Sequence, residues 1–393
     1  MTSLGSEKIA QAVSCLRDED IDMWLILSTE GSDPCLPLIV EEYVSGSSAY
    51  VITGDGKKVA IVSPIDGAGI KASGVFDEVI TFSPGLDETL KALIFELNPG
   101  RIALNYSRTD GLCDGLTLGK YYWLMDLLGP DFDDRYVSSE NFLKQLRSIK
   151  TPEEIRRTRE AVRLTQEIYS SVFPRLKPGL SEKQVSDLFV DEMIARRVVS
   201  GGDKSLSGPM VLKERMTHRL PGDAVIEPGD FLVMDYSIDY RGYASDIART
   251  AYFLKPGETK APAPMQKAFD TAVQAVTKAL DAMKPGVTGV EVDAVARRHI
   301  VDAGFPEIRH ATGHQIGRKV HDGGVMLGPR WARYKGASDG KLEAGMLFAV
   351  EPTVLQDDGP CVIVEENVVV TDDGMELMSK RQMELILVPP PGK

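Results

Sequence analysis

Cysteine and histidine are scarce in this chain, and both scarcities are informative. The 393 residues include four cysteines and no Cys-x-x-Cys pair, which argues against a disulfide framework and against a structural zinc knot. Five histidines are present, and three of them, His310, His314 and His321, fall within a stretch of twelve residues. A functional role is therefore expected for that stretch.

Long hydrophobic runs and runs of basic residues are also missing. No segment approaches the roughly 18 consecutive apolar residues of a membrane helix, and the first residues lack the basic-then-apolar order of a signal peptide. The net charge of −13 disfavours nucleic acid and anionic membranes as partners. A cytoplasmic enzyme is expected, and 43% hydrophobic content over this length is enough for two domains with sizeable cores.

The pattern of apolar residues changes character along the chain. Residues 1–133 alternate between helix-like and strand-like stretches, which predicts an α/β N-terminal domain. The segment 129–134 is polar and turn-rich, so the second domain is expected to cover residues 134–393. A long helix should begin directly after Thr151, which is a good N-cap and is followed by proline and two acids.

An internal repeat lies in the second part of the chain. The segment 177–181, Lys-Pro-Gly-Leu-Ser, recurs as Lys-Pro-Gly-Val-Thr at 284–288, a displacement of 107 residues. Each copy follows one amphipathic stretch and precedes another. A chance match between two helix stops is the alternative; a real repeat predicts an α+β domain of two related halves, with a site at their interface.

The most specific signal is a pair of acids placed symmetrically about a turn. Asp235 and Asp246 flank the turn signal Asp-Tyr-Arg-Gly at 239–242. A hairpin centred between Tyr240 and Arg241 would bring the two acids face to face. Directly opposed residues have Cβ atoms only about 4.5–5.5 Å apart, so two carboxylates there repel unless protons or cations lie between them.

A second acidic pair repeats this arrangement. Glu351 and Glu365 are symmetric about Asp-Asp-Gly at 357–359. The residues before each acid are apolar, which predicts that the strands carrying these acids are buried. An unpaired carboxylate is energetically costly in such a position. Solvated acids on surface hairpins are the alternative. Four carboxylates with clustered histidines predict a site for zinc, manganese, cobalt or iron that supports metal-assisted hydrolysis.

These residues resemble the pita-bread metallopeptidases, a family that includes Xaa-Pro dipeptidases (prolidases), Xaa-Pro aminopeptidases, methionine aminopeptidases and the metal-free creatinases. The resemblance covers essentially the whole chain. It rests on the spacing of Asp235 and Asp246, on Gly-His-Gln-Ile-Gly around His314, and on the segments around Glu351 and Glu365. All five positions match, whereas creatinases lack the complete set. The implied fold is an α/β creatinase-like domain followed by an α+β pita-bread catalytic domain with an internal pseudo-twofold repeat.

The resemblance also implies a role for each of the five matched residues. Asp235 would hold one divalent ion, His314 and Glu351 would hold the other, and Asp246 and Glu365 would bridge both. Glu351 would in addition serve as a proton shuttle. Manganese is the first expectation for the two ions, with cobalt, zinc or iron as alternatives.

Five further residues concern the substrate. His218 and His321 match family histidines that donate hydrogen bonds to the substrate or to the tetrahedral oxyanion, and His310 matches a position with a weaker role. For each, an interior histidine with a structural role is the alternative. Where Xaa-Pro peptidases carry a tyrosine and an arginine, this chain has Leu355 and Ile363. Replacing one of two polar partners would leave the other unsatisfied, so their joint replacement indicates a coordinated change. Since the family's polar contact near the metals is lost, the sequence supports hydrolysis better than it supports specificity for proline.

The resulting prediction is a dinuclear metal-dependent hydrolase that cleaves the Xaa-Pro bond of dipeptides or short peptides. The resemblance further implies a homodimer. Two alternatives stay open. The same metal site could act on another small amide or in a lyase reaction, or the chain could be a binding module that has kept the fold without turnover.

Overall fold

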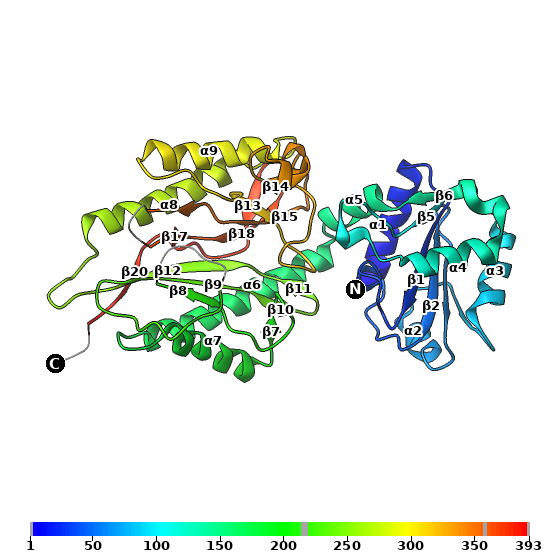
Figure 1. Ribbon diagram of the computed structural model, residues 1–393, viewed down its shortest axis with the longest axis horizontal. Helices are drawn as coiled ribbons and strands as arrows, with labels where there is room; N and C mark the ends of the chain where they lie inside the picture. Colours follow the sequence, from blue (N-terminus) through cyan, green and yellow to red (C-terminus); the bar gives the residue numbers. More distant parts are fainter. Residues whose placement is uncertain (1–2, 214–218, 357–359, 391–393) are drawn as a thin grey trace. The chain divides into compact units, whose positions relative to one another are not determined.

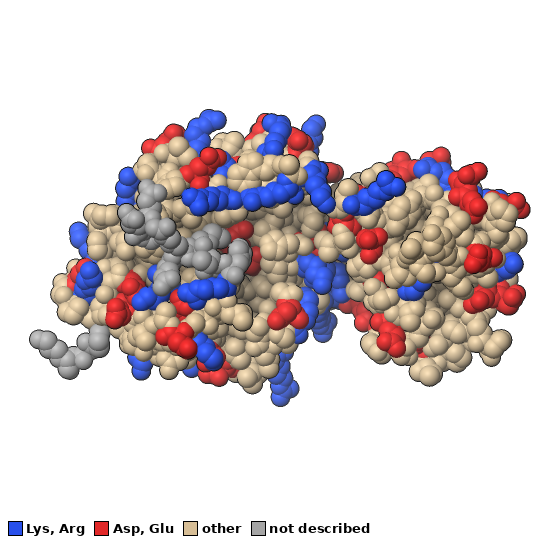
Figure 2. All heavy atoms as spheres, viewed as in Figure 1, with Lys and Arg blue, Asp and Glu red and all other residues tan. Residues whose placement is uncertain are grey.

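The computed structural model describes residues 3–213, 219–356 and 360–390. The chain divides into two compact units, Met1–Arg147 and Ser148–Lys393, which we call the N-terminal unit and the C-terminal unit. On the face drawn in Figure 2, acidic and basic side chains are interspersed over both units. Among the helices of the described ranges, none combines the length and the apolarity that a bilayer crossing requires.

The N-terminal unit is built on a mixed sheet with the strand order β4-β3-β2-β1-β5-β6. The sheet is parallel toward both edges, and β2 runs antiparallel to its two neighbours. The strands are β1 (Met23–Thr29), β2 (Ser47–Thr53), β3 (Lys58–Val62), β4 (Glu78–Thr81), β5 (Ile102–Leu104) and β6 (Tyr136–Ser138).

Helices cover both faces of this sheet (Figure 1). They are α1 (Leu4–Asp18), α2 (Gly67–Ser73), α3 (Leu86–Leu97), α4 (Leu118–Leu128) and α5 (Glu140–Ser148). Ile9 of α1 and Phe142 of α5 belong to the core on one face, whereas Leu90 of α3 and Leu124 of α4 belong to the core on the other. Successive strand residues point to opposite faces, so each strand supplies both cores. The α/β prediction for this part of the chain is confirmed.

The boundary between the units lies later than the predicted position after residue 133. β6 pairs in parallel with β5, and α5 places Leu143 and Leu146 in the core of the N-terminal unit. The polar segment that suggested the boundary contains a short 3₁₀ helix, Pro130–Arg135, within the N-terminal unit. Turn-rich composition thus marked a surface connection between two elements of the same unit.

The C-terminal unit contains two helix pairs on opposite sides of its strands (Figure 1). The first pair is α6 (Pro152–Val172) with α7 (Glu182–Arg196), and the second is α8 (Ala263–Ala282) with α9 (Gly289–Asp302). Helix α6 begins after Thr151 as predicted, because the Thr151 hydroxyl accepts a hydrogen bond from the backbone N–H of Glu154 and the Glu154 carboxylate accepts one in return from the N–H of Thr151.

The strands of the C-terminal unit form two main sheets and two short ladders. The first sheet has the order β20-β12-β9-β8 and the second has the order β14-β13-β15-β18-β19, while short ladders join β11-β10-β7 and β16-β17. The strands are β7 (Val199–Ser200), β8 (Met210–Leu212), β9 (Phe231–Tyr236), β10 (Ile238–Tyr240), β11 (Tyr243–Ala244), β12 (Ile247–Phe253), β13 (Gly313–Gln315), β14 (Met326–Leu327), β15 (Leu347–Val350), β16 (Thr353–Val354), β17 (Val362–Ile363), β18 (Glu366–Val370), β19 (Met375–Leu377) and β20 (Ile386–Val388).

The sequence repeat corresponds to the connection within each helix pair. Gly179 has φ +93° and Gly286 has φ +88°, a conformation that glycine adopts without strain. The N–H of Gly179 donates to the carbonyl of Ile226 over 2.8 Å, and the N–H of Gly286 donates to that of Leu342 over 2.8 Å. The repeated Ser or Thr that follows begins α7 or α9 with a capping box. The predicted pair of related halves is therefore present.

The hairpin between β9 and β12 turns one residue later than predicted. Tyr240 pairs with Tyr243, so the turn is formed by Arg241 and Gly242 rather than centred before Arg241. Their φ values are +50° and +86°, which is the conformation of a tight two-residue hairpin turn with glycine at the second position. The need for a glycine there, rather than the symmetry of the acids, fixes the register.

Gly242→Ala should destabilise the protein more than Gly257→Ala. Both glycines have positive φ, +86° and +88°, and an alanine at either costs about 1–2 kcal/mol of unfolding free energy in strain. A Cβ at Gly242 would also lie 2.9 Å from the Arg318 guanidinium, whereas a Cβ at Gly257 meets nothing within 4 Å. Urea denaturation measures the difference, and equal losses for the two variants would contradict the packing at the turn.

Candidate metal centre

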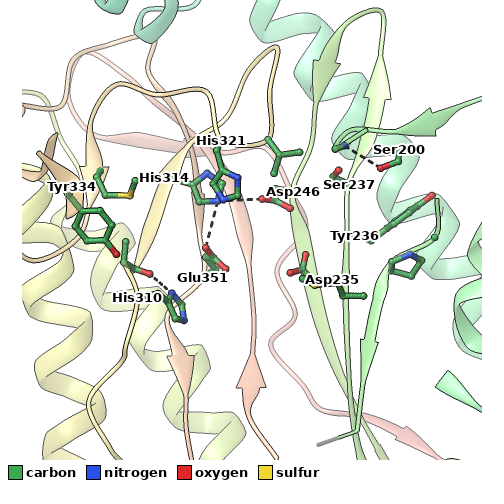
Figure 3. Close-up of a pocket in the computed structure, with 17 residues that line it drawn as sticks. Ser200, Asp235, Tyr236, Ser237, Asp246, His310, His314, His321, Tyr334 and Glu351 are labelled. Carbon is green, nitrogen blue, oxygen red and sulfur yellow. Dashed lines mark hydrogen bonds and ion pairs between the residues drawn. The ribbon is translucent and has the colours of Figure 1, made fainter. Parts of the chain in front are cut away.

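The corrected register changes how the first two acids meet. Asp235 on β9 pairs with Ala248 on β12, not with Asp246. Asp246 lies two residues before Ala248, and residues two apart point to the same face of a sheet. The two carboxylates are therefore diagonal neighbours rather than directly opposed. Both still point into the same cavity (Figure 3).

The register of the second pair is the predicted one. Val350 pairs with Glu366 between β15 and β18, and β16 and β17 continue with the same register. That register places Glu351 opposite Glu365. The turn at 357–359 on which the prediction was centred lies outside the described residues. The register predicted from symmetry is correct here, because the strand pairs before and after the two glutamates share one register.

A hydrogen bond joins the two acidic pairs. The backbone N–H of Glu365 donates to the carbonyl of Ala248 over 3.3 Å, and Ala248 is the ladder partner of Asp235. The Arg249 guanidinium donates to the carbonyl of Glu365 over 2.6 Å. Strands from the two halves of the C-terminal unit are thus held in contact at the acids themselves.

His314 completes the cluster. Its Nε2 lies 3.4 Å from a carboxylate oxygen of Asp246 and 3.6 Å from one of Glu351. Asp246, His314 and Glu365 are buried, and each offers a possible ligand atom within 4.8 Å of the other two. With Asp235 and Glu351 beside them, the structure brings together all five residues that the sequence predicted as metal ligands.

The ionisation of these groups reflects burial and mutual repulsion. Burial raises the pKa values of Asp235, Glu351 and Glu365, and the charge of Asp246 raises them further. The pKa of Glu351 is raised to about 7, although the charge of His314 acts to lower it. Burial alone would lower the pKa of His314, but a hydrogen bond to Asp246 and the charge of Glu351 raise it to about 9. Without a cation, these carboxyl groups therefore tend to bind protons, because the surroundings do not stabilise four negative charges together.

Glu365 provides the test of whether a cation fits. Its side chain is buried, and both carboxylate oxygens lack a hydrogen-bond partner among the described residues. Buried polar atoms are rarely left unsatisfied, and each exception calls for an explanation such as an ion. Oxygen and imidazole donors of this kind are ligands for divalent transition metals. The residues present fit such a group.

A cavity of about 530 Å³ opens beside the cluster. One wall comes from the first half of the unit, with Tyr236 and Ser237, and the other from the second half, with Tyr334 (Figure 3). Met326 also lines the cavity. Ser237 could have been anticipated, because it lies two residues after Asp235 and strand alternation puts it on the same face. Tyr334 ends a short 3₁₀ helix, Ala332–Tyr334, and no periodic pattern marked it.

The remaining predicted histidines have different surroundings. The exposed ring of His321 lines the cavity and packs on His314, with ring centroids 4.2 Å apart. His310 also lines the cavity, but its Nδ1 lies 2.7 Å from the carbonyl of Ala311 and its Nε2 lies 2.9 Å from the Thr353 hydroxyl. His218 lies outside the described residues.

Leu355 and Ile363 lie beside the acids rather than in the cavity wall. Both belong to a small apolar cluster with Val233, Ala248 and Cys361. Neither is among the described residues that line the cavity. Val233 and Ala248 share the sheet face of the acids, so the cluster forms an apolar patch next to the candidate metal centre.

Comparison with known families identifies the chain. Residues 156–372, more than half of the sequence, match Metallopeptidase family M24. The chain belongs to metallopeptidase family M24. The predicted assignment to an enzyme family of metallopeptidases is confirmed, and membership implies peptide substrates and divalent metal ions.

Relatives and solved structures agree with this assignment. A Bacillus subtilis protein named uncharacterized peptidase YqhT is 29% identical over 261 residues, 65% of this chain and 69% of that protein. A Xaa-Pro dipeptidase from Bacillus anthracis superposes with a TM-score of 0.76 at 23% identity, covering 98% of this chain and 100% of that one. An X-Pro aminopeptidase from Thermotoga maritima gives 0.75 at 22% identity, covering 97% and 99%. These structures share the pita-bread fold, which confirms the predicted fold.

The stability of the metal-free protein should fall as pH rises. In the unfolded chain the acids titrate near pH 4 and histidine near about 6.5, whereas Glu351 titrates at about 7 and His314 at about 9 in the folded cluster. The folded state therefore binds more protons between these values, and the free energy of unfolding decreases from about pH 5 to about pH 8.

Glu365→Gln tests this origin, because it removes one of the raised carboxyl groups. Chelator-treated Glu365→Gln protein should show a shallower decrease than chelator-treated wild type in thermal melts across the same pH range. Parallel curves for the two proteins would mean that the acidic cluster does not cause the pH dependence.

Proposed function

We propose that this chain is a dinuclear metal-dependent hydrolase that cleaves the Xaa-Pro bond of dipeptides or short peptides. The observation that carries the proposal is the convergence of Asp235, Asp246, His314 and Glu351 at one cavity, with the buried Glu365 beside them. A binding module has no need to hold four mutually repelling carboxylates in one place. The names of the structurally similar Xaa-Pro dipeptidase and aminopeptidase support the choice of substrate.

The arrangement supports a division of the ligands between two ions. The charge of Asp246 acts on all three other acids, and the charges of those acids act on Glu365, which suits Asp246 and Glu365 to bridge both ions. Asp235 lies on the side of the first half of the unit and would hold one ion. His314 and Glu351 lie together on the second half and would hold the other. Manganese remains the first expectation, with cobalt, zinc or iron as alternatives.

The chemistry follows from the groups around the cavity. Divalent cations supply Lewis acidity, which polarises a carbonyl and makes water more acidic. Glu351 would take a proton from the attacking water and return it to the leaving amine, the proton-shuttle role that the family resemblance implies. His321 lines the cavity, and we assign to it the donation of a hydrogen bond to the developing oxyanion. His310 has a weaker claim because protein groups lie within hydrogen-bonding distance of both its ring nitrogens.

The apolar cluster around Leu355 and Ile363 favours a relaxed specificity. In the Xaa-Pro peptidases that the sequence resembles, those positions carry a tyrosine and an arginine. Without these polar groups, the protein has fewer contacts that discriminate among leaving groups. Hydrolysis of other small amides is therefore the second candidate function. The homodimer and the cytoplasmic location stay predictions.

Removing a bridging carboxylate should abolish metal binding and activity together. In Asp246→Ala or Glu365→Ala, one ligand is lost to both ions and the remaining acids still repel each other. Elemental analysis should find the metal content reduced, and cleavage of Xaa-Pro dipeptides, longer Xaa-Pro peptides and non-proline dipeptides should disappear. Glu227→Ala, which removes an exposed acid, is the control and should keep both properties. Two tightly bound ions in either bridging variant would exclude the bridging role.

Leu355 and Ile363 should be energetically coupled. Leu355→Tyr alone places a hydroxyl in the apolar cluster without a partner and should lower kcat/KM. Leu355→Tyr combined with Ile363→Arg should recover part of that loss, because the two new side chains can satisfy each other. A double-mutant cycle on kcat/KM for a Xaa-Pro dipeptide measures the coupling. Strictly additive effects would show that the two departures from the family pattern are independent.

A further inference from the structure

A buried ion pair, outside the set of predicted ligands, includes the residue that follows His321 of the cavity wall. The ammonium group of Lys150 is 3.2 Å from a carboxylate oxygen of Asp322, and the two side chains are 0% and 3% exposed. Lys150 precedes α6 at the start of the C-terminal unit. Asp322 directly follows His321, the histidine that packs on His314.

The ion pair anchors the segment 317–324, which we call the His321 loop. The backbone N–H of Asp322 donates to the carbonyl of Gln315 over 2.9 Å, and the Asp322 carboxylate accepts from the N–H of Lys319 over 3.2 Å. Lys150 is itself fixed, because its backbone N–H donates to the carbonyl of Gly345 over 3.0 Å. The residue next to His321 is therefore held through both its backbone and its side chain.

Two glycines of the His321 loop lie so close to neighbouring side chains that a Cβ at either position would clash. A Cβ at Gly317 would lie 2.2 Å from the Asp322 carboxylate and 2.8 Å from Cε of Lys150. A Cβ at Gly324 would lie 2.4 Å from the Ser148 hydroxyl, and Gly324 has φ +70°. Glycine at 317 allows the loop to approach the buried charges closely, and glycine at 324 allows it to approach Ser148 and Gln315.

We propose that the Lys150–Asp322 ion pair positions His321 against His314 at the cavity. The proposal rests on the catalytic role assigned to His321 under the proposed function. Lys150 and Asp322 are positioning residues, since neither lines the cavity among the described residues. A buried ion pair adds little stability over well-packed apolar residues. It does impose a fixed separation and direction, and the placement of an oxyanion donor requires that precision.

The test separates stability from position with the variant Lys150→Met/Asp322→Leu. Apolar replacement of both partners avoids leaving one buried charge alone, so the variant should keep its melting temperature and its metal content. Its kcat on a Xaa-Pro dipeptide should fall by about 10–100-fold, because small misplacements of a catalytic group are costly. KM should change less than kcat. Lys319→Met, which removes an exposed charge from the same loop, is the matched control and should leave kcat unchanged.

The decisive comparison adds His321→Ala to both backgrounds. In the wild-type background this change should lower kcat by about 10²–10³-fold, the loss typical of one oxyanion donor. In the Lys150→Met/Asp322→Leu background the further loss should be much smaller, because His321 is already out of place. Equal fold-losses in the two backgrounds would overturn the proposal.

A structural readout keeps this inference separate from the proposed function. Nuclear Overhauser contacts between the rings of His314 and His321 should be present in the wild type and in Lys319→Met, and lost in Lys150→Met/Asp322→Leu. If His321→Ala leaves kcat intact, the catalytic role of His321 fails, and the ring contacts alone then decide the positioning role. Contacts that survive in the double variant overturn it. If the double variant does not fold, Asp322→Asn is measured in the same ways, because it keeps the shape and removes the charge.

Discussion

Repulsion among buried and half-buried acids is the constraint on which the C-terminal unit depends. Asp235, Asp246, Glu351 and Glu365 meet at one place, and burial and mutual charge oppose their ionisation. The strands that carry them are nevertheless held together by backbone hydrogen bonds and by packed cores on both sides. Divalent cations are the counter-charge that suits this set of oxygen and imidazole donors. Cations bound by these side chains would both relieve the repulsion in the folded protein and supply the Lewis acidity for hydrolysis.

The duplicated architecture explains how such a cluster can be assembled. Each half supplies a helix pair, a glycine-containing connection and a sheet that ends in acids. The hydrogen bond from Glu365 to Ala248 joins the halves directly at the acids. Because the candidate ligands come from both halves, neither sheet has to accommodate all the charge by itself, and the cavity is lined by residues of both halves.

Sequence symmetry predicted this site to different degrees. The Glu351 and Glu365 register followed from symmetry alone, whereas the Asp235 and Asp246 register shifted because Gly242 is required at a positive φ position. The register shift is such that both aspartates remain on one face of the sheet, so their carboxylates still lie near each other as predicted. The Lys150–Asp322 ion pair had no local signal, because its partners are distant in sequence and meet only through the fold.

Anomalous X-ray scattering from crystals grown with manganese tests the central claim most directly. Data collected on both sides of the manganese absorption edge locate each ion without assumptions about activity. The account predicts two separate peaks, one nearer Asp235 and one nearer His314, with Asp246 and Glu365 in contact with both. A single peak, or no peak among these side chains in an active preparation, would contradict a dinuclear centre.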